Sequence, residues 1–241
     1  MGRRKNYSNT DTKAKTEYIK SPETISPDMF YGKRLDEHQC EFANAIWDKD
    51  TDIVFVNAKA GTGKTFISIG VANLLVQYGL YPEIVYIMAP YGEKKQGWLP
   101  GNIDEKSAVY FEQLHQALVK CNINPYTSIK NDVNNQKSGE GYITCITDTF
   151  LRGWTIDNAV VIIDEAQNYT VSQLKKVLTR IGEHTKVIVV GHTLQCDLED
   201  QLISGFAKYI DHFSEQERAA SCTLVKNYRG WISQFADSLE D

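Results

Sequence analysis

Residues 52–65 read DIVFVNAKAGTGKT and carry the strongest structural signal in the chain. The first six of them are mostly β-branched or aromatic, which predicts a short strand over residues 52–57. A loop of small residues follows, and residues 64–78 are predicted to form a helix. Consecutive backbone N–H groups in such a loop, with a helix N-terminus behind them, can face an anion closely because glycine adds no side-chain bulk. The order strand, glycine-rich loop, helix therefore predicts a phosphate-binding P-loop.

The loop runs from Ala58 to Thr65 and departs from the strict pattern G-x-x-x-x-G-K-S/T only at its first position. Ala58 stands where the first glycine belongs, so this position must accommodate a Cβ atom. We expect Lys64 to place its charge at the β- and γ-phosphates and the Thr65 hydroxyl to ligate Mg²⁺. The residues expected to bind the nucleotide phosphates are Ala60, Gly61, Thr62, Gly63, Lys64 and Thr65. An ordinary glycine-rich turn with a surface lysine is the alternative interpretation.

Four more stretches have the composition of strands, and helical patterns alternate with them. The strands are expected at residues 83–89, 142–147, 159–164 and 185–190, and the other helices at residues 35–47, 102–120 and 172–181. The last two strands are near-continuous apolar runs, which is typical of parallel strands buried on both faces. Five strands alternating with helices predict one α/β domain, with a mainly parallel sheet, helices on both faces and ligands beyond the carboxyl ends of the strands.

The composition is that of an ordinary globular protein, with 241 residues, 42% of them hydrophobic and 24% charged. Residues 1–29 are polar and predict a flexible basic segment ahead of a domain over residues 30–241. Charge is uneven, because residues 1–20 carry a net charge of +4 and the rest of the chain carries −9. A solvated tail and a weak contact with a nucleic-acid backbone are both compatible with that basic segment.

Cysteine usage and hydropathy disfavour several classes of protein. The five cysteines form no C-x-x-C pair, which disfavours a disulfide framework or a zinc ribbon and favours a reducing, cytoplasmic setting. No apolar run approaches the roughly 18 residues of a membrane helix, and the polar N-terminus lacks the apolar core of a signal peptide. We therefore expect neither a membrane protein nor a secreted one.

Two adjacent acids follow the apolar run at residues 160–163. At the carboxyl edge of the sheet, beside a P-loop, Asp164 suits the Mg²⁺ shell and Glu165 suits a general base that activates water. Hydrolysis of a nucleoside triphosphate needs both roles, whereas a kinase for small molecules would not need the second acid. The alternative is a helix cap, since Asp164 and Gln167 have the spacing of a capping box.

Two further polar residues are candidates for contacts with the γ-phosphate. Gln195 follows the strand predicted at residues 185–190, where its amide could bond the γ-phosphate or the attacking water. Arg229, near the C-terminus, could stabilise charge in the transition state as an arginine finger. Exposed arginines are common, so a surface role for Arg229 is the alternative.

The order of these motifs resembles that of superfamily 1 helicases. Gln39, the P-loop, residues 164–167, residues 191–195 and residues 227–229 come in the order of the Q motif and motifs I to IV. A closer resemblance is to the PhoH family of P-loop ATPases, and it extends over about residues 33–235. The stretches that carry it are GEKKQGWLPG at 92–101, FLRG at 150–153, IDEAQN at 163–168, LTR at 178–180 and QCDL at 195–198.

The resemblance implies a single RecA-like domain that binds and hydrolyses ATP with Mg²⁺, with Gln39 contacting adenine. It also implies a link to RNA metabolism or phosphate starvation, and short proteins of this kind are frequent in phage genomes. One such domain would not unwind a duplex alone, so we expect a homo-oligomer, with a hexameric ring as the form the family suggests. In a ring, Arg229 or Arg180 of a neighbour could complete each ATP site, and single-stranded RNA or DNA would be the partner.

The sequence departs from the family pattern at Ala58, at His192 where an aspartate is usual, and at Lys226-Asn227 where Arg-His is usual. A histidine beside the γ-phosphate contact changes the local charge, because its protonation varies near neutral pH. A binding module whose attachment is controlled by ATP, with little turnover, is therefore the alternative function. A small-molecule kinase is the third candidate function, but a kinase would give Glu165 and Gln195 no role.

Overall fold

The computed structural model describes residues 21–89, 103–130, 141–151, 153–196, 198 and 203–236. Within these residues, six strands form one parallel sheet in the order β3-β2-β4-β5-β1-β6. The strands are β1 (Ile53–Ala58), β2 (Ile84–Met88), β3 (Ile143–Thr147), β4 (Val160–Asp164), β5 (Lys186–Gly191) and β6 (Ala219–Leu224). The α-helices are α1 (Glu37–Trp47), α2 (Lys64–Gln77), α3 (Ile103–Lys120), α4 (Pro125–Ser128), α5 (Val171–Leu178), α6 (Phe206–Phe213) and α7 (Trp231–Ala236).

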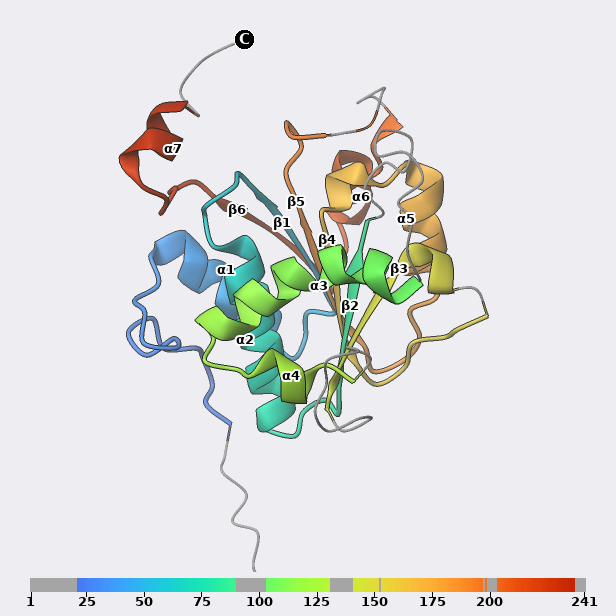
Figure 1. The fold of residues 1–241 in the computed structure, drawn as a ribbon, viewed down its shortest axis with the longest axis horizontal. Coiled ribbons are helices and arrows are strands. Elements are labelled where there is room, and N and C mark those ends of the chain that lie inside the picture. Colours follow the sequence, from blue (N-terminus) through green and yellow to red (C-terminus); the bar gives the residue numbers. More distant parts are fainter. Residues whose placement is uncertain are drawn as a thin grey trace, which may run out of the picture.

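Helices cover both faces of this sheet (Figure 1). Successive residues of a strand point to opposite faces, so the apolar run of β4 contributes Ile162 to one core and Ile163 to the other. The first core lies under α1, α2 and α3, and the second lies under α5 and α6. Every residue of β4 and β5 is buried, which confirms the α/β domain with helices on both faces that the apolar runs predict.

The strand β6 corrects the predicted number of strands from five to six. Its sequence AASCTL lacks a β-branched apolar run. Three of its six residues are half-buried and two are exposed, because it pairs with β1 alone, at the edge of the sheet. This strand is recognised by its hydrogen bonds to β1. The pattern of its own side chains does not predict a strand.

The packed part of the chain also extends beyond the predicted boundary at residue 30. Ile25 is buried, and its backbone N–H donates to the Asn44 side chain on α1 at 2.8 Å. The Trp47 indole donates to the Pro22 carbonyl at 2.9 Å. Residues 1–20, the larger part of the predicted flexible segment, lie outside the described residues. Among the described residues, no helix has both the length and the apolar character needed to cross a membrane.

Candidate nucleotide-binding site

The P-loop lies where β1 ends and α2 begins, as the sequence predicts. Gly61 and Gly63 have φ angles of +81° and +90°, a conformation that favours glycine. Space is also limiting at Gly61, because a Cβ there would come within 2.4 Å of Asn227 Oδ1. Ala58, by contrast, is the last residue of β1 and is buried in the core. The core therefore accommodates the methyl group at the position of the missing first glycine.

Gln39 on α1 holds the P-loop from the side. Its amide N–H donates to the Thr62 carbonyl at 2.8 Å, and its amide oxygen accepts from the Asp36 N–H at 3.1 Å in a capping box. The Thr62 hydroxyl in turn donates to the Lys59 carbonyl at 2.9 Å. The first helix therefore fixes the loop through a buried amide. Contact of Gln39 with adenine stays a prediction.

Asp164, at the end of β4, is brought against the P-loop threonine. The Thr65 hydroxyl donates to Asp164 Oδ2 at 3.1 Å, and the carboxylate is only 1% exposed. A hydroxyl and a carboxylate oxygen are ligands of the kind that Mg²⁺ prefers, so these two residues fit the predicted cation site. In the described parts of the chain, no group of three or more His, Cys, Asp or Glu residues is placed to hold a metal ion by itself. A Mg²⁺ ion that arrives with a nucleotide would take further ligands from the phosphates.

Tyr86 is a member of this site that the sequence analysis missed. It lies on β2, the neighbour of β4, and its hydroxyl donates to Asp164 Oδ2 at 2.5 Å. Burial, together with the adjacent carboxylate of Asp164, raises the pKa of Tyr86 well above its ordinary value. The phenol therefore stays protonated and serves as a fixed donor. Its position in the middle of an apolar strand gave no signal in the sequence.

Glu165 has a backbone conformation that is rare for a residue with a side chain, with φ +53° and ψ +40°. Such strain is typical of functional positions. Its carboxylate accepts a hydrogen bond from the Gln167 amide at 2.6 Å. The oxygen of that amide accepts from the His192 N–H at 3.1 Å. The sequence analysis named Gln167 only as a possible capping partner and as part of a family motif. The structure shows that it joins the candidate base to the loop after β5.

The alternative of a capping box at these acids is wrong. The 3-10 helix η2 (Ala166–Asn168) begins after Glu165, and no side chain caps it. Asp164 instead accepts from the adjacent Glu165 N–H at 2.9 Å through Oδ1.

The loop after β5 returns to the P-loop strand through Asn57. The Asn57 side chain accepts from the Thr193 N–H and donates to its hydroxyl, both at 3.1 Å. His192 is buried in this loop. Gln195 is exposed, and its backbone N–H donates to the His192 carbonyl at 3.2 Å. Its role as a γ-phosphate contact stays a prediction.

The segment after β6 lies on the P-loop of its own chain. The Tyr228 N–H donates to the Gly61 carbonyl at 2.9 Å, and its hydroxyl donates to Asp36 at 2.6 Å. A Cβ at Gly61 would come within 2.8 Å of Arg229 Cγ, so the arginine packs against the same loop. Arg180 is elsewhere, because its carbonyl accepts from the Ile156 N–H ahead of the amino end of β4. Arg229 therefore sits beside the predicted site without a neighbour, whereas Arg180 could reach such a site only in another copy.

Comparison with known proteins agrees with this geometry. The family model described as PhoH-like protein matches residues 33–229. The chain belongs to the PhoH family. It is 35% identical over 185 residues to Protein PhoH of Escherichia coli K12, covering 75% of this chain and 49% of that protein. It is 34% identical over 170 residues to a PhoH-like protein of Bacillus subtilis, covering 70% of this chain and 50% of that one. The chain thus spans about half the length of the curated relatives it matches.

Among solved structures, the chain is similar to the large terminase of bacteriophage HK97. The TM-score is 0.49 and the identity 16%, over 84% of this chain and 42% of the terminase. Membership of the PhoH family, together with the P-loop, makes this chain a nucleotide-binding protein of the P-loop NTPase class.

Proposed function

We propose that this protein binds ATP with Mg²⁺ at the P-loop and hydrolyses it, with Glu165 as the general base. The observation that carries the proposal is the pair of acids beside the loop. Asp164 is hydrogen-bonded to Thr65, and Glu165 is oriented by Gln167 at the same edge of the sheet. One acid suits the cation and the other suits the water, which is the division of roles that hydrolysis requires.

The remaining groups of the site fit a triphosphate. The N–H groups of residues 60–65 and the N-terminus of α2 would bind the phosphates, and Lys64 would add charge at the β- and γ-phosphates. Thr65 and Asp164 would hold Mg²⁺, which neutralises phosphate charge when bound. Glu165 would accept a proton from a water molecule while the oxygen of that water attacks the γ-phosphorus. The bond between the γ-phosphorus and the oxygen that bridges to the β-phosphate then breaks, which gives ADP and phosphate. Gln195 and Arg229 would stabilise the charge that develops.

The Gln39 amide retains the hydrogen-bonding capacity that recognition of adenine needs. An amide group has two N–H donors and a carbonyl oxygen with two lone pairs. The bonds to Thr62 and Asp36 use one of each. One donor and one lone pair remain, and this is the set that pairs with N7 and N6 of adenine.

The second part of the proposal concerns the stimulation of ATP turnover by nucleic acid and the oligomeric state of the protein. Following the family resemblance, we propose that single-stranded RNA or DNA stimulates turnover and that the protein works as a homo-oligomer, with a hexameric ring as the expected form. A cytoplasmic role in RNA metabolism or phosphate starvation, in a phage-type protein, follows from the same resemblance.

A nucleotide-gated binding module is the second candidate function. The observation in its favour is that residues 227–229 contact the P-loop directly and lead into α7. ATP occupancy could therefore move a surface element without much turnover.

Steady-state ATP hydrolysis by the full chain, with and without single-stranded RNA and DNA, separates these functions. Turnover that requires Mg²⁺ and rises with nucleic acid supports the ATPase. Tight ATP binding with no turnover under either condition contradicts it and supports the module.

A further inference from the structure

A tight turn between β6 and α7 carries Arg229. The Asn227 side-chain oxygen accepts from the Arg229 N–H at 2.8 Å. A bond from an asparagine side chain to the backbone two residues further on closes a local turn of this kind. The direction in which the chain presents Arg229 is therefore set first by Asn227.

The inner side of this turn rests on the P-loop. The Tyr228 N–H donates to the Gly61 carbonyl at 2.9 Å, and the Tyr228 hydroxyl donates at 2.6 Å to Asp36, the N-cap residue of α1. A Cβ atom at Gly61 would come within 2.4 Å of Asn227 Oδ1 and within 2.8 Å of Arg229 Cγ. The side chains of Asn227 and Arg229 therefore lie directly against the loop.

The outer side of the turn is held by one side chain of α7. The Gln234 amide nitrogen donates to the Asn227 carbonyl at 3.1 Å and to the Arg229 carbonyl at 2.8 Å. An amide group has two N–H donors, so one glutamine can satisfy both carbonyls at once. The two carbonyls lie on either side of Tyr228 in the sequence, and Gln234 thus bridges the residues that flank the bond to the P-loop.

Hydrogen bonds carry this arrangement, because burial contributes little to it. None of the six residues of α7, all of which are described, is buried, and Arg229 is exposed as well. Figure 1 shows α7 standing apart from the sheet and from the helices that cover it. The Ser233 and Gln234 N–H groups add a backbone link, since they donate to the Gly230 carbonyl at 3.0 and 3.3 Å. The Gln234 amide then joins the helix to the turn through two further bonds.

The position of the turn matters because an arginine that stabilises transition-state charge acts over a short range. The Arg229 side chain lies along Gly61, with Cγ and Cδ nearest to the loop. A shift of the Arg229 backbone would therefore move the guanidinium group with it. A misplacement of about 1 Å can lower the rate of an enzyme by about 100-fold.

We propose that Gln234 is a positioning residue for ATP hydrolysis. By holding the carbonyls of Asn227 and Arg229, its amide keeps the turn seated on Gly61 and keeps Arg229 at the P-loop of its own chain. The inference rests on the proposed function, in which Arg229 stabilises the charge that develops on the phosphate. Gln234 acts through Arg229 and does not touch the nucleotide.

The variant Gln234→Leu tests the inference, because leucine suits a helix but lacks both N–H donors. The matched control is Gln116→Leu, since Gln116 is an exposed glutamine whose amide donates to Glu112 within α3 at 2.9 Å. We expect kcat for ATP hydrolysis to fall by about tenfold in Gln234→Leu while KM stays close to the wild-type value. The control should keep both constants, and circular dichroism checks that each variant folds.

A double variant shows whether Gln234 acts through Arg229. Single-turnover hydrolysis, which resolves slow rates, is compared in Arg229→Ala and in Arg229→Ala/Gln234→Leu. Equal rates are expected, because a positioning residue has no further effect once the group that it positions is gone. A further fall as large as that in the Arg229 background of the wild type would overturn the inference and assign Gln234 a general structural role.

The same samples separate this inference from the proposed function. A wild-type chain without Mg²⁺-dependent turnover would overturn the proposed function and the inference with it. An active wild type with an equally active Gln234→Leu variant would overturn the inference alone. Amide hydrogen exchange without nucleotide provides a second readout, since exchange at the Tyr228 N–H should be faster in Gln234→Leu than in the control. Unchanged exchange would show that Gln234 does not hold the turn.

Discussion

At the scale of single residues, the candidate site depends on a few buried side chains that fix the two acids. Tyr86 and Thr65 both donate to Asp164, and Gln167 donates to Glu165. Each donor restricts the orientation of its carboxylate. The two acids that we propose as cation ligand and general base are therefore held in place by the protein itself.

Replacing Glu165 tests the assignment of the base. Glu165→Gln should keep ATP binding but lower turnover by about 100-fold or more, because an amide cannot accept the proton from water. Lys64→Ala should lose ATP binding or turnover, since the charge at the phosphates is removed. Nucleotide binding by fluorescence and steady-state hydrolysis measure the two effects. Wild-type turnover in Glu165→Gln would show that another group is the base.

Replacing Tyr86 tests its role behind the cation ligand. Tyr86→Phe removes one donor to Asp164 and should raise the Mg²⁺ concentration needed for ATP binding several-fold, because the carboxylate is less firmly oriented. The matched control is Tyr142→Phe, since the Tyr142 hydroxyl donates at 2.5 Å to Asn73, away from the acids. Titration of Mg²⁺ with ATP present gives the midpoint. Equal midpoints in both variants and the wild type would argue against the role of Tyr86.

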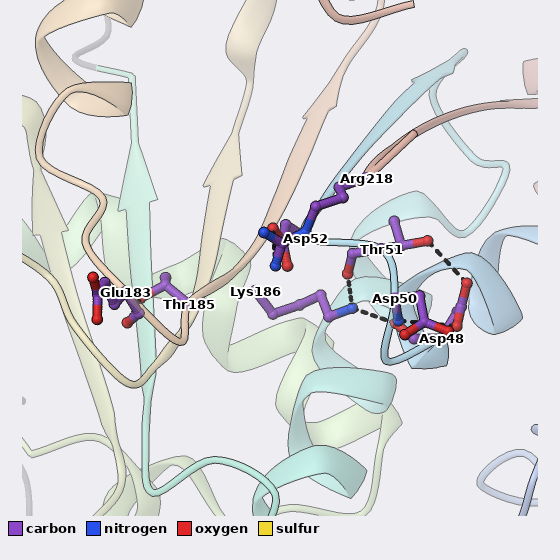
Figure 2. Close-up of polar contacts among 8 residues, drawn as sticks. All are labelled: Asp48, Asp50, Thr51, Asp52, Glu183, Thr185, Lys186 and Arg218. Carbon is purple, nitrogen blue, oxygen red and sulfur yellow. Dashed lines mark hydrogen bonds and ion pairs between the residues drawn. The ribbon is translucent and has the colours of Figure 1, made fainter. Parts of the chain in front are cut away.

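At the scale of elements, buried side chains join helices and loops to the ends of strands. Lys186, the first residue of β5, donates to two carbonyls of the turn between α1 and β1 (Figure 2). At the other end of β5, His192 bonds Gln167. The same strand thus anchors α1 at one edge of the sheet and the candidate base at the other.

The buried ammonium group of Lys186 gives a prediction for stability against pH. Burial lowers the pKa of Lys186 to about 8, despite the nearby aspartates. An unfolded chain holds this proton up to about pH 10.4. Between these values the unfolded state binds more protons at Lys186, so this residue alone should contribute a rise in the free energy of unfolding of about 1 kcal/mol per pH unit.

Lys186→Met is the comparison for that prediction, because it keeps the length of the side chain and removes the titrating group. The free energy of unfolding of the wild type minus that of the variant, from urea unfolding, should rise from pH 7.5 to 9.5. The difference is the quantity to compare, because burial raises the pKa of Cys121 to about 12 and that of Cys222 to about 11, and their ionisation in the unfolded chain lowers the stability of both proteins equally. Parallel pH profiles for the two proteins would refute the lowered pKa. The range stops below pH 10 because ionisation of tyrosines in the unfolded chain then lowers stability.

At the scale of the whole molecule, residues 227–229 return to the P-loop of their own chain. Arg229 packs on Gly61 of the same chain, although it is far away in the sequence. An arginine finger supplied from within one chain does not need a neighbour.

Mixing two inactive variants tests this arrangement. Arg229→Ala keeps its P-loop, and Lys64→Ala keeps its arginine. If each arginine serves its own chain, mixed assemblies should recover no turnover beyond the sum of the separate variants. Recovery would indicate that a neighbour supplies the arginine, as in the ring suggested by the family resemblance. Hydrolysis at several mixing ratios measures the effect, with wild type mixed with Lys64→Ala as the control.

Short-range patterns in the sequence determined the fold class and the main parts of the site. The strand, glycine loop and helix at the P-loop are consecutive, and the apolar run of β4 leads directly into its two acids. Such features depend on neighbouring residues and on strand periodicity, so they can be recognised without a structure. The parallel sheet then brings its carboxyl ends to one edge, which is why Asp164 meets Thr65.

Only the tertiary structure decided which other side chains complete the site. Tyr86 and Asp164 are 78 positions apart, and Gln167 and His192 are 25 apart. Tyr228 reaches Gly61 through the edge strand β6, whose small residues give no strand pattern. These contacts depend on the order of strands in the sheet and on hydrogen bonds across it, and neither is encoded in the spacing of residues along the chain.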